Sequence, residues 1–314
     1  MQFQYRPVAV DRGSCAKASR RDVRPAGEST ELRGTDLAES KGKALQFRSR
    51  LRLPVLMYHH VGPRQPGTHP ELTVSPERFE RHVRWLARRG YTGIRPADWA
   101  RWRHDSNGVP DKPLLLTFDD GYTDLAEYAL PVLRRYGFSA AVYIVTGQLG
   151  GTNAWNIAQG SAPHRLLTAE QIQYWAAQGI EFGAHSRTHA DLTTLSAREL
   201  EHEVMGSAED LATLLGSRVV SFAYPYGFLN SAVVNCVKKS YDLAFSAGNQ
   251  YEGLNHLLTN PHVLSRTMVQ TNDSLLDLEC RARWGYSPIL RLRTRLRLGT
   301  RIRSAANFVS GRHS

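Results

Sequence analysis

An apolar run that ends in two carboxylates constrains the fold of this chain more than any other feature. The run covers residues 114–118, and Asp119, Asp120 and Gly121 follow it directly. A short, continuous apolar segment is typical of a strand that is buried on both faces, as in a parallel sheet. We therefore expect an α/β fold in which both aspartates lie at the carboxyl end of such a strand. In α/β barrels, catalytic side chains converge at that end.

Two histidines follow a second predicted strand. His185 and His189 flank the tripeptide Ser-Arg-Thr, directly after residues 181–184. Two imidazoles and one carboxylate suit a zinc-like ion and leave a position open for water, and the second carboxylate can then serve as the base. Helical zinc proteases have a glutamate beside the first histidine, which this sequence lacks. Each motif alone also fits a turn or a surface position, but their joint occurrence at strand ends favours a metal site.

Strand and helix patterns alternate along the middle of the chain. Strands are predicted over residues 53–58, 91–94, 114–118, 140–145, 180–184, 219–223, 243–246 and 263–265. Helices are predicted from Ser75, and over residues 98–103, 124–136, 168–178, 196–215 and 231–239, where Ser196 and Glu199 form a capping box. This alternation favours one parallel-stranded barrel over separate domains.

The basic charge of the chain belongs to its two ends. The 314 residues have a net charge of +11. Residues 53–280 contain 19 basic and 23 acidic residues, whereas residues 281–314 contain 9 arginines and no acidic residue. A basic groove across the site is therefore not indicated, and we expect no nucleic-acid partner. The sequence divides into a disordered or loosely attached basic extension (1–52), a catalytic domain (53–280) and an arginine-rich amphipathic tail (281–314).

The two ends also bear on where the protein acts. The tail has arginine at every second position from 291 to 297, which fits either peripheral contact with an anionic membrane or a solvated end. The N-terminal residues lack the apolar segment of a secretory signal, and no stretch approaches the length of a membrane span. These features indicate a cytoplasmic or peripheral membrane location. Cys15, Cys236 and Cys280 are widely spaced and are expected to be free thiols.

Three short motifs occur in order along the predicted barrel. They are Thr-Phe-Asp-Asp-Gly (117–121), His-Ser-x-x-His (185–189) and Pro-Tyr-Gly (225–227). Together they resemble the polysaccharide deacetylases of the chitooligosaccharide-deacetylase type, over about residues 53–280. Residues 56–61 and 222–227 look more like the poly-N-acetylglucosamine deacetylase branch than the chitin or peptidoglycan branch. The resemblance implies a distorted (β/α)7 barrel that removes acetyl groups from N-acetylated sugars of a polysaccharide or glycolipid, with the cell envelope as an alternative location.

The resemblance also implies roles for individual residues. Asp119 would be the general base, Tyr226 would donate its backbone N–H to the oxyanion, and the metal, most simply Zn²⁺, would be held by Asp120, His185 and His189. The acid would be His59, from the early Tyr-His motif. His60 follows it along the strand and should point away from the site. Many relatives use a late histidine as the acid, but His262, the candidate here, precedes a strand and should lie at the opposite end of the barrel.

One position departs from the family pattern. Many members have an arginine two residues before the Pro-Tyr pair, where it orients the base aspartate, and Ala223 occupies that place here. A base aspartate without a cationic partner would have a higher pKa and would be held less firmly. Arg266, just after the last predicted strand, is a candidate to supply the charge from another strand end.

Other residues are candidates for contact with the substrate. Trp155 and Asn156, in a glycine-rich loop, are placed to stack on a sugar ring, although covering the core explains a loop tryptophan equally well. Tyr224, next to Pro225, fits either a wall of the substrate site or ordinary barrel packing.

Three other functions each fit a part of the sequence. An O-acetyl esterase acting on a polysaccharide would form the same oxyanion and would need no acid to protonate an amine. A carbohydrate-binding relative without catalytic activity is disfavoured by the complete set of aspartates and histidines. A nucleic-acid binder is suggested only by the basic ends.

Overall fold

A parallel sheet forms the centre of the structure, a computed structural model that describes residues 51–64, 70–105, 107–157, 160–248 and 253–289. The strand order is β10-β1-β5-β6-β7-β8-β9, and every adjacent pair is parallel. β4 pairs with the start of β5, and β2 and β3 form a separate pair. The strands are β1 (Val55–Tyr58), β2 (His60–Val61), β3 (Thr73–Val74), β4 (Thr92–Gly93), β5 (Pro113–Phe118), β6 (Ala141–Ile144), β7 (Glu181–Ala184), β8 (Ser221–Ala223), β9 (Leu243–Phe245) and β10 (Thr267–Met268).

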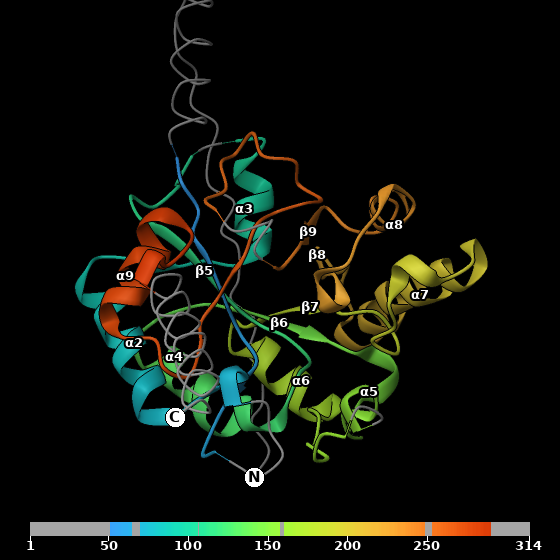
Figure 1. The fold of residues 1–314 in the computed structure, drawn as a ribbon. Helices are drawn as coiled ribbons and strands as arrows, with labels where there is room; N and C mark the ends of the chain where they lie inside the picture. Colours follow the sequence, from blue (N-terminus) through green and yellow to red (C-terminus); the bar gives the residue numbers. More distant parts are fainter. Residues whose placement is uncertain (1–50, 65–69, 106, 158–159, 249–252, 290–314) are drawn as a thin grey trace, which may run out of the picture. The chain divides into compact units, whose positions relative to one another are not determined.

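Helices follow most of the strands, and most of them pack against the outside of the curled sheet (Figure 1). They are α2 (Pro76–Arg88), α3 (Pro96–Trp102), α4 (Leu130–Arg135), α5 (Ala154–Ile157), α6 (Ala169–Ala177), α7 (Ala197–Leu215), α8 (Ser231–Val237) and α9 (Leu275–Trp284). A π-helical segment (Leu125–Ala129) precedes α4, and short 3-10 turns cover Pro70–Leu72, Thr146–Gln148, Leu192–Thr194 and Pro225–Gly227. The predicted alternation of strands and helices is confirmed.

The sheet curls into a half-barrel, which confirms the predicted distorted barrel. After β9, the segment around Leu264 pairs in parallel with Phe245 and extends the wall towards β10. Asn255 joins this segment to the start of β1, because its side-chain amide donates to the carbonyl oxygens of Leu53 and Ser265.

The period of two residues along β5 explains why the site lies inside the barrel. Leu114, Leu116 and Phe118 belong to the large apolar cluster under the helices, whereas Leu115 belongs to the cluster on the other face. Successive side chains of a strand point to opposite faces. Asp119 therefore follows Leu115 on the inner face of the sheet.

Local capping fixes the starts of two helices as the sequence predicts. Ser75 precedes α2, and its hydroxyl accepts the N–H of Arg78 at 3.3 Å. Ser196 and Glu199 form the expected capping box at the start of α7, since each side chain accepts the backbone N–H of the other residue.

The C-terminal helix α9 crosses residue 280, where the sequence analysis placed the end of the catalytic domain. Arg281 is buried and donates to Asp273 at 2.8 Å. The buried Cys236 and Cys280 are free thiols, as expected. No helix in the described ranges is long and apolar enough to cross a membrane. The extension 1–50, including Cys15, and the arginine-rich residues 290–314 lie outside the described residues.

Candidate active site

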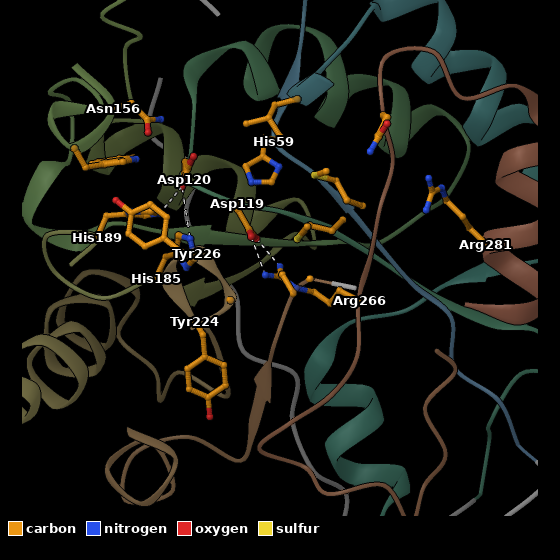
Figure 2. Close-up of a pocket in the computed structure, with 18 residues that line it drawn as sticks. His59, Asp119, Asp120, Asn156, His185, His189, Tyr224, Tyr226, Arg266 and Arg281 are labelled. Atoms are coloured by element: carbon orange, nitrogen blue, oxygen red, sulfur yellow. Dashed lines mark hydrogen bonds and ion pairs between the residues drawn. The ribbon is translucent and has the colours of Figure 1, made fainter. Parts of the chain in front are cut away.

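The three side chains predicted as metal ligands converge at the carboxyl ends of β5 and β7. Asp120 follows β5, and His185 and His189 follow β7. Asp120 Oδ1 lies 3.3 Å from His189 Nε2 and 3.6 Å from His185 Nε2. One ligand atom from each residue lies within 4.8 Å of the other two, and all three residues are buried (Figure 2). These residues form a candidate metal site.

The protonation state of His185 suits binding of a cation. The Nδ1 of His185 lies 2.8 Å from the carbonyl oxygen of Ala223. An oxygen of that kind only accepts, so Nδ1 carries the proton and Nε2 presents its lone pair to Asp120. Burial lowers the pKa of His185 to about 4 and thereby favours the neutral imidazole.

The carboxylate of Asp120 completes the fit. Burial would raise its pKa, but the facing imidazoles, His189 first, hold the pKa below its ordinary value. Asp120 Oδ1 is buried and has no hydrogen-bond partner within the described part of the chain. A neutral imidazole, as at His185, and an ionised carboxylate, as at Asp120, are the forms that bind a divalent cation.

The backbone of the turns that carry these residues is strained. Asp120, Ser186, His189 and Tyr226 have φ angles of 72°, 61°, 63° and 58°, and they are the non-glycine residues with positive φ among those described. A left-handed residue costs about 1–2 kcal/mol. Such strain persists only where the surrounding contacts hold it, and it is common at functional sites.

The second carboxylate is held by an arginine. Arg266 Nη1 donates to Asp119 Oδ1 at 2.5 Å, and Nη2 donates to Oδ2 at 2.8 Å. The Arg266 side chain is fully buried and is further fixed by Nε, which donates to the carbonyl oxygen of Ser246 at 3.1 Å. Burial would raise the pKa of Asp119, but Arg266 and His185 outweigh it and hold the pKa below its ordinary value. Arg266 thus supplies the cation that Ala223 does not.

These groups open into a pocket of about 320 Å³. His59 lies on its wall, and His59 Nδ1 has no hydrogen-bond partner among the described groups. Burial lowers the pKa of His59, whereas Asp119 and Asp120 act in the opposite direction. Tyr226 also lines the pocket, with its ring 4.5 Å from that of His189.

Comparison with known proteins identifies this arrangement. The family profile for polysaccharide deacetylase matches residues 106–242, which include both aspartates and both histidines. The Streptococcus pyogenes deacetylase PplD, solved in complex with acetate, superposes with a TM-score of 0.63 and 25% sequence identity over 73% of this chain and 97% of PplD. The chain contains a polysaccharide deacetylase domain.

The chain covers a different share of each relative of the deacetylase domain. YxkH of Bacillus subtilis, described as a polysaccharide deacetylase, is 28% identical over 189 residues, which are 60% of this chain and 62% of YxkH. The chain thus spans less than two thirds of YxkH. Poly-beta-1,6-N-acetyl-D-glucosamine N-deacetylase of Staphylococcus epidermidis is 21% identical over 223 residues, 65% of this chain and 74% of the relative. IcaB from Ammonifex degensii shares the fold, with a TM-score of 0.61 and 21% identity over 74% of this chain and 97% of IcaB.

The deacetylase domain also contains a clamp that the sequence analysis missed. Glu203 of α7 accepts the backbone N–H groups of Arg187 and Thr188 and the hydroxyl of Thr188, each at 2.9 Å. The Ser186 hydroxyl accepts the N–H of His189 at 3.0 Å. The turn between the two histidines is therefore fixed from both sides. The available signal was a carboxylate on the apolar face of α7, between Leu200 and Leu211.

Two further candidates occupy different positions in the deacetylase domain. Trp155 lines the pocket, but its ring stacks on His189 with centroids 4.7 Å apart and an interplanar angle of 14°. The Tyr224 side chain points away from the site (Figure 2). Its hydroxyl donates to the carbonyl oxygen of His262 at 2.8 Å, so the ring belongs to the barrel packing. Pro225 is buried in the turn before Tyr226.

The neighbouring histidines lie away from the pocket of the deacetylase domain. His60 Nδ1 lies 2.7 Å from Asp124 Oδ2, and its ring stacks on Tyr122 with centroids 3.7 Å apart. His262 Nε2 lies 3.0 Å from the carbonyl oxygen of Tyr241. It lines a separate cavity beside Asp242 and Leu243, at the amino end of β9. Both placements agree with the sequence analysis.

Proposed function

We propose that this protein is a metal-dependent hydrolase that removes N-acetyl groups from N-acetylhexosamine residues of a glycan and releases acetate. The observation that carries the proposal is the pairing of two adjacent aspartates with different partners. Asp119 is clamped by Arg266, whereas Asp120 faces His185 and His189. One carboxylate is thus equipped as a base and its neighbour as a ligand.

The donor set suits Zn²⁺, since two imidazoles and one carboxylate leave a coordination position open. Asp120, His185 and His189 would hold the ion. When bound, such a cation polarises the acetyl carbonyl and makes water more acidic. A deacetylase needs this help because an amide is a weak electrophile.

The residues around the site divide the proton transfers between them. Asp119 accepts a proton from the water that attacks the acetyl carbon, and Arg266 keeps both carboxylate oxygens oriented during that transfer. The Tyr226 N–H donates to the oxygen on which charge develops, a contribution typically worth about 3–4 kcal/mol. His59, in its protonated form, donates to the nitrogen as the C–N bond breaks. The products are acetate and a free amine on the sugar.

The choice of sugar rests on likeness to relatives. The segments 56–61 and 222–227 resemble the poly-N-acetylglucosamine branch, and the Staphylococcus epidermidis relative is named for poly-beta-1,6-N-acetyl-D-glucosamine. We therefore place N-acetylglucosamine polymers first among the substrates. Contact of the basic tail with an anionic membrane, and action at the cell envelope, are consistent with a polymeric or lipid-linked glycan.

Acetate release from N-acetylglucosamine oligomers tests the proposal. The protein loaded with Zn²⁺ should release acetate, and Asp119→Asn and Asp120→Asn should each lower the rate to background. Metal analysis should show that only Asp120→Asn loses the ion, because Asp119 is not a ligand. Metal retained in full by Asp120→Asn would contradict the ligand assignment. Acetate released from O-acetylated polysaccharide but from no N-acetylated oligomer would replace the proposal with an esterase.

A further inference from the structure

The turn after β8 presents two aromatic rings to solvent beside the pocket. Tyr226 is 40% exposed and Phe228 is 52% exposed. Their ring centroids lie 5.7 Å apart with an interplanar angle of 34°, so the two rings form one strip. Tyr226 lines the pocket and contacts His189. The strip therefore begins at the candidate metal site and leads away from it.

The turn that carries the strip is anchored to the barrel. The Gly227 N–H donates to the carbonyl oxygen of Tyr224 at 2.9 Å, and the Phe228 N–H donates to that of Pro225 at 3.1 Å. Gly227 has a φ of 73°, and a Cβ there would lie 2.5 Å from the carbonyl oxygen of Ala247. Because the backbone is already ordered, little conformational entropy is lost when a ligand covers the rings.

A pyranose ring is the ligand that matches this surface. Its faces carry C–H groups and its edge carries hydroxyls, so a flat aromatic ring can cover a face while the hydroxyls remain in water. Tyrosine and phenylalanine bury a large apolar area on such contacts. The strip is continuous with the pocket, which the proposed function assigns to the reacting sugar.

We propose that Tyr226 and Phe228 form a second sugar subsite, which stacks on the residue next to the one being deacetylated. The inference rests on the proposed function and extends it, because it assigns named residues to a sugar other than the one that reacts. Phe228 is then a specificity-determining residue with no part in the chemical step.

Comparison of long and short substrates tests the subsite. We would measure kcat/KM of the Zn²⁺-loaded protein for an N-acetylglucosamine pentamer and for the monosaccharide. Phe228→Ala should lower the value for the pentamer by about 3–10-fold more than for the monosaccharide, the size of one aromatic contact. Phe228→Tyr should restore it. Tyr174→Ala is the matched control, because Tyr174 is a 54% exposed aromatic residue on α6 that lies outside the pocket.

A binding measurement separates this inference from the proposed function. Pentamer affinity would be measured with Asp119→Asn, which does not turn the substrate over, with and without Phe228→Ala. Weaker binding upon loss of Phe228 supports the subsite even if the wild-type protein deacetylates nothing. Equal losses on both substrates, unchanged pentamer affinity, or a pentamer that does not bind at all would overturn it. Self-association that disappears in Phe228→Ala, with unchanged pentamer kinetics, would assign the strip to a protein interface instead.

Discussion

Replacing Arg266 with methionine should destabilise the protein far more than removing both partners of its ion pair. Arg266→Met leaves the carboxylate of Asp119 buried without the two hydrogen bonds of 2.5 and 2.8 Å that now neutralise it. Removal of one partner of a buried pair typically costs about 3–5 kcal/mol. The second substitution, Asp119→Asn, removes the uncompensated charge. We therefore expect the double variant to be more stable than Arg266→Met by about 1–3 kcal/mol.

The pH dependence of stability provides an independent test of this argument. In the wild-type protein the pKa of Asp119 is lowered, so the stability from its pairing is present above the ordinary carboxyl pKa and is lost as pH falls. Without Arg266, burial dominates and the pKa of Asp119 should rise. The destabilisation by Arg266→Met should therefore be largest at pH 8 and smaller at pH 5.

Urea denaturation with a chelator present measures these free energies without a contribution from metal binding. With metal restored, Arg266→Met should also lower kcat by about 10–100-fold, because the base Asp119 is no longer held in place. Arg266→Lys is the matched control, because it keeps the charge but not the two-pronged geometry. Its stability and its kcat should lie between those of the wild type and of Arg266→Met. A double variant less stable than Arg266→Met, or a destabilisation independent of pH, would refute the argument.

Two further predictions concern residues around the barrel. Glu203→Gln should weaken Zn²⁺ binding by about 10-fold in a chelator competition, because the turn between the histidines loses a charged acceptor. The control Glu201→Gln, at an exposed position of the same helix, should leave the Zn²⁺ affinity unchanged. Burial raises the pKa of Glu181 to about 7, so the stability it contributes is lost as pH rises from about 4.5 through 7. In urea denaturation, the free energy of unfolding of Glu181→Gln should thus exceed that of the wild type by about 1–3 kcal/mol at pH 8 and equal it at pH 4.5. The same difference at both pH values would exclude this account.

Local patterns carried the prediction of the secondary structure. The apolar run of β5, the cap at Ser196 and the alternation of segments place strands and helices close to their observed bounds. The π-helical interruption before α4 and the helix α9 escaped prediction, the predicted loop at Trp155 is the short helix α5, and the last strand of the sheet is β10 rather than residues 263–265. The π-helical interruption and α9 have no strong hydrophobic period, although Ser274 and Asp277 form a capping box that marks the start of α9.

Motif spacing likewise placed the ligands of the candidate site. Asp120, His185 and His189 follow strands that had been identified from sequence, and parallel strands bring their carboxyl ends to one side of a barrel. The direction of the Tyr224 ring was left open, because packing and substrate contact both suit a tyrosine after a strand. The structure decides between them through the bond to the carbonyl oxygen of His262.

By itself, the sequence determined which segments become strands and helices and which polar residues end those strands, because both depend on neighbours within a few positions of the chain. Only the tertiary structure decided which distant side chains meet. Arg266 reaches Asp119 across 147 positions, and Glu203 reaches the histidine turn from a different element. Such pairings depend on how the sheet curls and how α7 packs against it, and these are properties of the whole core that no local pattern encodes.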